Sequence, residues 1–267
     1  MKPYLTTDAA TLYHARAEEV YPHIAPGSVS MIWSDGPYAM RKAAWDMMGV
    51  DGLADWYAPH IEAWGKVCAP SATVYLWNTA EGWARIDPVM RAAGWVFRTL
   101  IVWDKMTPPS MLGWKAITEW PDQTEVAGTY SRGTPHFQLP APIGNVWEFS
   151  TKALSLEQIK GVAAPAKAAS DGDTCASLHP CQKPLAFASR AILASTRIGD
   201  TILDPFAGTN RIAVACRRLP PEERRHAVGI EMERRWLDAV RPSLVADHGA
   251  EVRKGQPSLF GPRRSVV

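Results

Sequence analysis

The chain has few cysteines and lacks the spacing of a metal site. Its 267 residues include four dispersed cysteines, and no two of them form a Cys-x-x-Cys pair. Cys175, His179 and Cys181 lie close together in the sequence, but a fourth ligand at useful spacing is missing. We therefore expect reduced structural thiols and no bound metal.

Long hydrophobic runs and a strong net charge are also absent. No run approaches the roughly 20 apolar residues of a membrane-spanning helix, and residues 1–11 lack the basic-then-apolar order of a secretory signal. These absences predict a cytoplasmic protein with no membrane partner. The net charge is +2, so a nucleic-acid surface would have to be a local patch, and composition alone indicates no partner.

What the chain does contain is an alternation of strand and helix patterns. A hydrophobic content of 46% with 21% charged residues is typical of a globular protein, and the length suits one large α/β domain with an insertion. The alternation predicts a doubly wound, mostly parallel sheet with helices on both faces. We expect strands at 11–14, 28–33, 72–77, 95–103, 146–149, 201–203 and 226–230, and helices from about 17, at 53–67, at 83–93, after 184 and from 212.

The alternation breaks between residues 104 and 142, where prolines and polar residues replace any sustained period. This pattern predicts a loop-rich insertion, and long irregular inserts are usually functional or mobile. A mixture of cations and aromatics there suits stacking on bases and contact with phosphates, while a packed lid is the alternative interpretation. We expect flexible segments at 163–177 and 251–267. The mixture comprises Lys105, Lys115, Arg132 and His136 with Trp114, Trp120, Tyr130 and Phe137.

The stretch Thr201–Arg218 changes from strand to helical spacing around Gly208. Such a unit places backbone N–H groups and a glycine at the carboxyl edge of a parallel sheet, where a small charged ligand can meet them. The next predicted strand ends in Glu231, about 20 residues later, where nucleotide-binding α/β folds place the carboxylate that bonds ribose hydroxyls. No Gly-Lys-Ser/Thr follows Gly208, so an adenosine-bearing cofactor without a pyrophosphate fits best.

A second group of polar residues follows the predicted strand at 28–33. Ser34, Asp35, Gly36, Pro37 and Tyr38 leave the carboxyl edge of the sheet together. Ligands of open α/β sheets sit where neighbouring strands send their connections to opposite sides. If the strands ending at residues 34 and 204 are neighbours, the two loops face each other across one cleft, one for a cofactor and one for a substrate.

Several segments of the chain resemble one known family. Asp35-Gly36-Pro37-Tyr38 is similar to the Asp-Pro-Pro-Tyr motif of the amino-methyltransferases that modify an exocyclic nitrogen of adenine or cytosine in DNA. His179–Pro184 resembles the His-Pro-Thr-Gln-Lys-Pro segment of their β class, Asp204–Asn210 resembles its cofactor loop, and Gly229–Glu231 resembles its ribose-binding strand. The order, with the catalytic motif first and the cofactor loop last, is similar to the circularly permuted order of that class.

The resemblance implies a circularly permuted, Rossmann-like methyltransferase fold. It implies one catalytic domain over residues 1–250, with 104–142 as the target-recognition insert, S-adenosyl-L-methionine as cofactor and double-stranded DNA as partner. Asp35 and the Gly36 carbonyl would accept the two amine hydrogens, Pro37 would stiffen the turn, and Tyr38 would stack on a flipped-out base. The implied cofactor-binding residues are Asp35, His179, Cys181, Gln182, Phe206, Ala207, Gly208, Thr209, Asn210 and Glu231.

Four positions depart from the family pattern. Gly36 replaces the first proline, Cys181 replaces threonine, and Arg16 stands where the first strand usually ends in aspartate. Asn210 stands where a second glycine is common, although Asn tolerates left-handed backbone. Lys183 could close the site or merely pack its stem. These departures leave both the acceptor and the aromatic ring in place.

Adenine N6 is the expected target atom, because the aspartate form of the motif is associated with adenine. The serine form is associated with cytosine N4, and Ser34 stands beside Asp35, so cytosine-N4 methylation is the first alternative. A catalytically weak protein that binds DNA and S-adenosylmethionine is a second alternative, and methylation of RNA or a protein amide is a third. A role in restriction-modification and a homodimeric assembly are further expectations from the resemblance.

Overall fold

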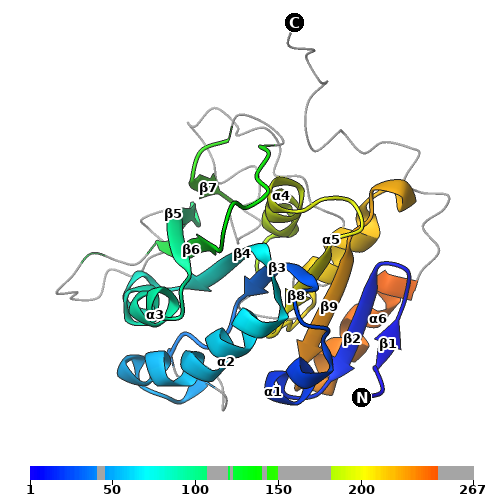
Figure 1. Ribbon diagram of the computed structural model, residues 1–267, viewed down its shortest axis with the longest axis horizontal. Coiled ribbons are helices and arrows are strands. Elements are labelled where there is room, and N and C mark those ends of the chain that lie inside the picture. Colours follow the sequence, from blue (N-terminus) through cyan, green and yellow to red (C-terminus); the bar gives the residue numbers. More distant parts are fainter. Residues whose placement is uncertain (41–45, 107–119, 121–122, 140–142, 150–181, 246–267) are drawn as a thin grey trace, which may run out of the picture.

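The computed structural model describes residues 1–40, 46–106, 120, 123–139, 143–149 and 182–245, which form a nine-stranded sheet between two layers of helices. The strand order is β1-β2-β9-β8-β3-β4-β6-β5-β7, and five of the eight strand pairs are parallel (Figure 1). This confirms the predicted α/β architecture with a mostly parallel sheet. The strands are β1 Leu5–Thr6, β2 Ala10–His14, β3 Val29–Ser34, β4 Cys68–Asn78, β5 Val96–Asp104, β6 Thr124–Ser131, β7 Val146–Glu148, β8 Thr201–Asp204 and β9 His226–Glu231.

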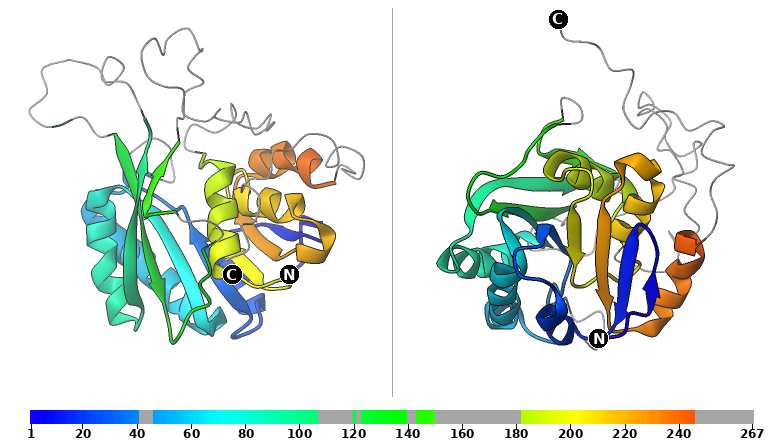
Figure 2. Two further views of the ribbon diagram at one scale, coloured as in Figure 1. Left: turned by 90° about the horizontal axis from the view of Figure 1, so that it is seen from above. Right: turned by 45° about the vertical axis from the view of Figure 1, so that its right-hand side comes forward.

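Helices cover both faces of the sheet, as Figure 2 shows. Side chains of successive strand residues point to opposite faces, so β3 sends Met31 and Trp33 into one apolar core and Ile32 into the other. The first core packs against α4, α5 and α6, and the second against α1, α2 and α3. The helices are α1 Ala17–Val20, α2 Leu53–Val67, α3 Ala80–Ala92, α4 Leu185–Ser195, α5 Arg211–Arg218 and α6 Arg234–Val245, with 3-10 turns η1 Tyr21–His23, η3 Val50–Gly52 and η6 Pro221–Glu223.

The predicted loop-rich insertion contains a core strand, so the prediction of an irregular 104–142 segment is wrong at β6. This strand lies between β4 and β5 and runs antiparallel to both. Its Gly128 lies against the Trp83 indole, where a Cβ would overlap the ring. The glycine and the polar residues of β6 hid the strand pattern, although its side chains are largely buried.

Two insert residues that the sequence associated with nucleic acid have structural contacts instead. The Tyr130 ring is fully buried, and its hydroxyl donates to Asp87 at 2.9 Å. The Arg132 guanidinium donates to the Gly65 and Ala93 carbonyls at 3.0 and 2.7 Å. Both side chains therefore join the insert to the core. Lys115 and Trp114 lie outside the described residues, as do the segments 163–177 and 251–267.

Within the described ranges, no helix combines the length and the apolar character that a membrane span requires. Those ranges also contain no cluster of three or more His, Cys, Asp or Glu side chains able to hold a metal ion.

Candidate active site

The carboxyl ends of β3 and β8 open into one large cavity. The two strands are parallel neighbours, paired through Met31 with Ile202 and Ile32 with Leu203. The cavity has a volume of about 840 Å³. It is lined from both sides by predicted site residues, which are Asp35, Gly36, Pro37, Tyr38, Gln182, Phe206, Ala207, Gly208, Thr209 and Glu231. The two loops therefore converge as the sequence predicted.

One wall of the cavity is the glycine loop, Asp204–Asn210. Gly208 has a φ of +47° and Asn210 a φ of +51°, both in the left-handed region. The Gly208 N–H donates to Glu231 Oε2 at 2.7 Å, and the Glu233 N–H donates to Oε1 at 2.6 Å. A Cβ built at Gly208 would meet no atom of the described residues within 4 Å, so among them the backbone there is open to a ligand.

Asn210 is absent from the lining of the cavity, and its predicted contact with a cofactor stays a prediction. Its side chain is buried, and Nδ2 donates to the Gly208 carbonyl at 3.0 Å. The amide packs against Gly229, where any Cβ would overlap it. Asn210 thus stabilises the conformation of the glycine loop through its contacts with Gly208 and Gly229. His179 and Cys181 lie outside the described residues.

Burial changes the protonation of two carboxyl groups beside the glycine loop. Desolvation, together with the Asp35 charge, raises the pKa of Asp204 well above its usual range. Burial also raises the pKa of Glu231, although backbone N–H groups partly oppose it. Asp204 Oδ1 is buried and has no hydrogen-bond partner within the described residues. The Asp204 carboxyl group therefore keeps one buried oxygen without a hydrogen bond next to this wall.

Aromatic residues of α2 enclose the far end of the glycine loop. The Phe206 ring lies 5.1 Å from the Trp56 ring and 5.0 Å from the His60 ring. Burial lowers the pKa of His60 to about 4, although the nearby Glu18 carboxylate opposes this. Both α2 side chains line the cavity. The sequence predicted a helix over these residues from their apolar spacing, without assigning its aromatic side chains to the site.

Arg16 also lines the cavity near this end. Its side chain is largely exposed and lies 3.4 Å from a Glu18 carboxylate oxygen. The family departure at this position therefore places a paired cation, rather than an aspartate, at the mouth of the cavity.

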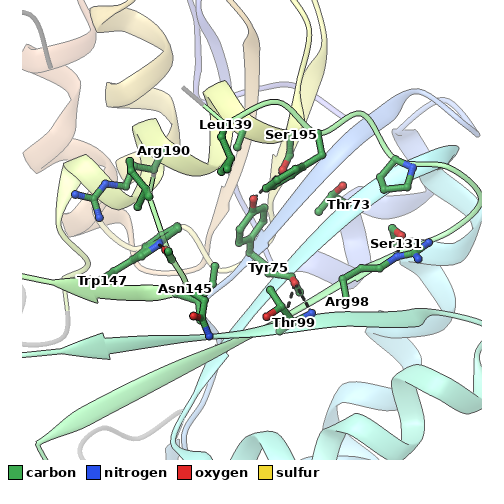
Figure 3. A pocket seen from close by; sticks show the side chains of 17 residues that line it. Thr73, Tyr75, Arg98, Thr99, Ser131, Leu139, Asn145, Trp147, Arg190 and Ser195 are labelled. Atoms are coloured by element: carbon green, nitrogen blue, oxygen red, sulfur yellow. Dashed lines mark hydrogen bonds between the residues drawn. The ribbon is translucent and has the colours of Figure 1, made fainter. Parts of the chain in front are cut away.

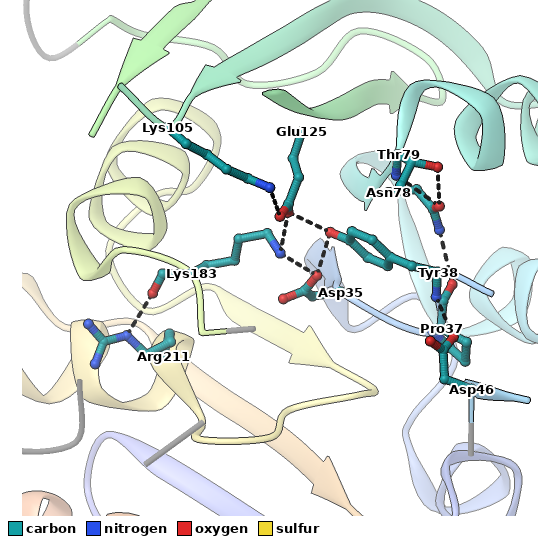
Figure 4. A network of polar contacts seen from close by, with 10 residues as sticks. All are labelled: Asp35, Pro37, Tyr38, Asp46, Asn78, Thr79, Lys105, Glu125, Lys183 and Arg211. Carbon is teal, nitrogen blue, oxygen red and sulfur yellow. Dashed lines mark hydrogen bonds and ion pairs between the residues drawn. The ribbon is translucent and has the colours of Figure 1, made fainter. Parts of the chain in front are cut away.

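The opposite wall holds a network of acidic, basic and hydroxyl side chains, here called the carboxylate network (Figure 4): Asp35, Tyr38, Lys105, Glu125 and Lys183. Lys183 Nζ lies 2.7 Å from Asp35 Oδ1 and 3.0 Å from Glu125 Oε2. The Tyr38 hydroxyl lies 2.9 Å from the same Asp35 oxygen and 3.1 Å from the same Glu125 oxygen. Lys105 Nζ lies 2.9 Å from Glu125 Oε1. Lys105 thus pairs with a carboxylate of the protein, and its contact with phosphate stays a prediction.

The contacts within the network shift the pKa values of Glu125, Lys183 and Tyr38. Burial alone would raise the pKa of Glu125, but the ammonium groups of Lys183 and Lys105 lower it to about 2. Burial alone would lower the pKa of Lys183, but the carboxylates of Asp35 and Glu125 raise it above its usual value. Burial and the same two carboxylates raise the pKa of Tyr38, so its hydroxyl keeps its proton. Charges of opposite sign therefore alternate along this wall.

Backbone contacts fix the loop that carries Asp35. The Tyr38 N–H donates to Asp46 Oδ1 at 2.9 Å, and Asn78 Nδ2 donates to the Pro37 carbonyl at 3.0 Å. A Cβ built at Gly36 would lie 2.6 Å from the Tyr57 hydroxyl and 2.9 Å from Phe206 Cδ2. A proline would not fit there, which explains the glycine in place of the family's first proline.

Ser34 is fully buried at the end of β3 and does not line the cavity. Asp35, in contrast, lines it and keeps 20% of its side chain exposed. The aspartate, and not the neighbouring serine, is therefore the side chain that a ligand in the cavity can reach.

A second cavity, of about 480 Å³, lies against the sheet on the side of α4 (Figure 3). The Tyr75 hydroxyl and Ser195 Oγ lie 2.7 Å apart on its wall. Its cations are Arg98 and Arg190, and no carboxylate from the described residues lines it. It therefore lacks the acceptor groups that distinguish the larger cavity.

Sequence reasoning missed most of the carboxylate network beyond Asp35 and Tyr38. Glu125 stands at the start of β6, a strand that the sequence did not reveal. Lys183 was noted without a definite role, although its side chain is only 2% exposed and is ion-paired. The one usable signal was its place directly after Gln182 in the motif that precedes α4.

Comparisons with known proteins agree with this geometry. The chain is 25% identical over 259 residues to the type II methyltransferase M2.LlaDCHI of Lactococcus lactis subsp. cremoris, covering 91% of this chain and 92% of that protein. It is 26% identical to the DNA adenine methyltransferase YhdJ of Escherichia coli K12, covering 90% and 85%.

Solved structures show the same fold. The cytosine-N4-specific PvuII DNA methyltransferase matches with a TM-score of 0.71 and 16% identity, covering 95% of this chain and 92% of that one. The M1.HpyAVI–SAM complex matches with a TM-score of 0.59 and 20% identity, covering 88% and 99%. These matches confirm the Rossmann-like methyltransferase fold, while the circular permutation stays a prediction.

A family model described as DNA methylase (N6_N4_Mtase) matches residues 29–241. The match begins at β3 and ends within α6, so it contains Asp35, the carboxylate network and the glycine loop. The chain therefore belongs to this family of DNA methylases.

Proposed function

We propose that this DNA methylase transfers the methyl group of S-adenosylmethionine to the exocyclic amine of a base flipped out of double-stranded DNA, with adenine N6 as the target. The observation that supports it most is that the reachable Asp35 carboxylate and the open Gly208 backbone line the same cavity. A cofactor and an amine that enter from the two walls would meet there.

The glycine-loop wall fits S-adenosylmethionine. The cavity volume of about 840 Å³ lies within the usual range for small-molecule sites, roughly 300–1,000 Å³. Glu231 lines the cavity and is placed to accept hydrogen bonds from ribose hydroxyls. When bound, S-adenosylmethionine supplies an electrophilic methyl group on its sulfonium.

Further cofactor contacts follow from the family motifs. Phe206, Ala207 and Thr209 line the cavity beside Gly208, and Gln182 lines it near Lys183. We propose that His179 and Cys181 join Gln182 at the methionine end.

The carboxylate network prepares the acceptor for the amine. An exocyclic amine is a weak nucleophile because its lone pair is delocalised into the ring, so acceptors for both N–H bonds favour a pyramidal, reactive nitrogen. We assign these acceptors to the Asp35 carboxylate and the Gly36 carbonyl. Pro37 stiffens the turn, and the Tyr38 ring, whose hydroxyl is held by the network, forms the wall on which the base stacks.

The Asp35 side chain, which a ligand in the cavity can reach, favours adenine over cytosine as the target base. Asp35 lines the cavity whereas Ser34 is buried, so the motif acts in its aspartate form. The relative YhdJ, which carries the name DNA adenine methyltransferase, agrees with this choice.

The test is methylation of mixed-sequence DNA with labelled S-adenosylmethionine, followed by digestion to nucleosides. We expect labelled N6-methyladenine with the wild-type protein and no label with Asp35→Ala. Label only in N4-methylcytosine would correct the target base. Tight DNA binding without any label would favour a catalytically weak binding protein.

A homodimer on duplex DNA completes the proposal, because a small reader of duplex DNA gains contact area from pairing. Sedimentation of the protein with and without duplex DNA tests this. We expect two copies per duplex, and a single copy at saturating protein would contradict it.

A further inference from the structure

The Asp35 carboxylate is held through one oxygen. Lys183 Nζ and the Tyr38 hydroxyl both contact Oδ1, at 2.7 and 2.9 Å. Within the described residues, every hydrogen bond of this carboxylate is made by Oδ1, and Figure 4 shows the second oxygen without a contact to the residues drawn. One oxygen is therefore anchored, and the other is left to accept a hydrogen bond in the cavity that Asp35 lines.

Glu125 holds the same two donors from the opposite side. Its Oε2 lies 3.0 Å from Lys183 Nζ and 3.1 Å from the Tyr38 hydroxyl. Lys183 and Tyr38 thus each bridge Asp35 and Glu125, and the four side chains close a ring (Figure 4). Lys105 Nζ lies 2.9 Å from the other Glu125 oxygen, Oε1. Because Glu125 extends from β6 and Asp35 from the end of β3, the ring ties two separate parts of the sheet together.

The shared ammonium decides how strong an acceptor Asp35 is. Lys183 is 2% exposed, so water does not screen its charge. With Glu125 present, that charge is shared between two carboxylates, at 2.7 and 3.0 Å from Lys183 Nζ. Without Glu125, the whole ammonium would act on Asp35 and weaken its hydrogen bond to a neutral amine.

We propose that Glu125 is a positioning residue for Asp35, which by sharing Lys183 and the Tyr38 hydroxyl fixes Oδ1 and leaves Oδ2 aimed at the amine of the target base. This inference rests on the proposed function of Asp35 as the amine acceptor. It adds a residue that the Asp-Gly-Pro-Tyr motif does not contain.

The first test is the single-turnover rate of methyl transfer by Glu125→Gln. We expect the rate to fall about 100-fold, the size of effect that a misplaced reacting group produces, with unchanged affinity for S-adenosylmethionine. Glu62→Gln is the matched control, because it removes the same charge from an exposed pair with Lys66 at 2.7 Å. We expect wild-type rate and affinity from the control.

The second test is the pH profile of the same rate. Lys183 faces the carboxylates of Asp35 and Glu125 and the aromatic ring of Tyr38. Lys105 contacts the other oxygen of Glu125. Two carboxylates raise the pKa of Lys183 against its burial. Losing the Glu125 carboxylate lowers the pKa of Lys183. As the pH is raised, the methyl-transfer rate of Glu125→Gln should therefore begin to fall at a lower pH than the rate of the wild type. A purely structural role would reduce the rate without moving the pH at which it begins to fall.

The outcomes separate this inference from the proposed function. A wild-type protein that transfers no methyl group would overturn the proposed function itself. A wild-type protein that methylates DNA, with Glu125→Gln equally fast, would overturn only the role of Glu125. If Glu125→Gln shows no cooperative melting or no cofactor binding, Lys105→Met is the variant to measure. It removes one contact of Glu125 and leaves both carboxylate partners of the buried Lys183 ammonium in place. We then expect about a tenfold loss of rate, and an unchanged rate would overturn the inference.

Discussion

The two walls of the large cavity are built in different ways. The glycine loop presents mainly backbone, with left-handed φ angles at Gly208 and Asn210, and its Gly208 N–H donates to the carboxylate of Glu231. The carboxylate network presents ionised side chains on separate strands and loops. The first wall suits a cofactor that must be bound in one shape, and the second suits a group whose hydrogens must be held while it reacts.

Removing the acceptor tests the network wall most strongly. Asp35→Ala deletes the carboxylate that the amine needs, and losing one oriented hydrogen-bonding group at a reacting centre costs up to about 1,000-fold in rate. We expect a loss of this size in turnover, measured by label transferred to DNA. S-adenosylmethionine affinity, measured by calorimetry, should fall far less than the rate. A variant that loses cofactor affinity but keeps its rate would show that the two walls have been assigned the wrong way round.

Removing Glu231 tests the other wall. Hydrogen bonds to charged groups contribute about 1.5–3 kcal/mol, so Glu231→Ala should weaken S-adenosylmethionine binding by about 10- to 100-fold. The rate at saturating cofactor should change little. Glu222→Ala, an exposed carboxylate in η6, is the control and should leave the affinity unchanged. Calorimetry checks both, and equal affinities would remove Glu231 from the cofactor site.

The junction of the two walls is tested at Gly36. A Cβ there would meet the Tyr57 hydroxyl and the Phe206 ring at 2.6 and 2.9 Å, and overpacking costs about 1–3 kcal/mol. Gly36→Ala should lower the free energy of unfolding by that amount in urea. The same change at Gly49, where no atom lies within 4 Å, should cost nothing. Equal stabilities for the two variants would show that Gly36 tolerates a side chain.

Acid should affect the two walls at different pH values. Burial raises the pKa of Glu231 above 4.5, so its carboxylate is lost, and cofactor affinity falls, as the pH drops from neutrality towards 4.5. Lys183 and Lys105 lower the pKa of Glu125 to about 2, against 4.5 in the unfolded chain. Its contribution to stability is therefore present above pH 4.5 and is lost as the pH falls towards 2.

A pH series of calorimetric affinity and thermal melting checks this order. We expect weaker cofactor binding at a pH where the protein still melts cooperatively. If the pH is lowered and cooperative melting is lost while cofactor affinity is still that of the wild type at neutral pH, this order would be contradicted.

The difference between the walls also explains what the sequence could predict. The glycine loop and Glu231 lie at the ends of apolar strands, and the contacts within this wall are made by residues close in the sequence or on adjacent strands. The helix 53–67 was predicted with the bounds that the structure gives it, because its apolar residues repeat at helical spacing. Local patterns were therefore sufficient for the glycine loop, for Glu231 and for most of the strands and helices, but not for the aromatic residues of α2 beside the loop.

The network wall depends on contacts that no local pattern contains. Glu125 reaches Lys183 only because β6 inserts between β4 and β5, and β6 carries Gly128 and polar residues that hide its buried character. Tyr130 is buried because Asp87 and Trp83 satisfy its hydroxyl, a pairing across 43 and 47 residues. Partners so far apart cannot be read from spacing alone.

The central claim is that the two walls face each other across a reacting methyl group. A crystal structure with bound S-adenosylmethionine tests it most directly. We expect the ribose at Glu231, the methionine chain along the glycine loop, and the methyl group directed towards Asp35 and Tyr38. A sulfonium that points away from these two residues would contradict the claim.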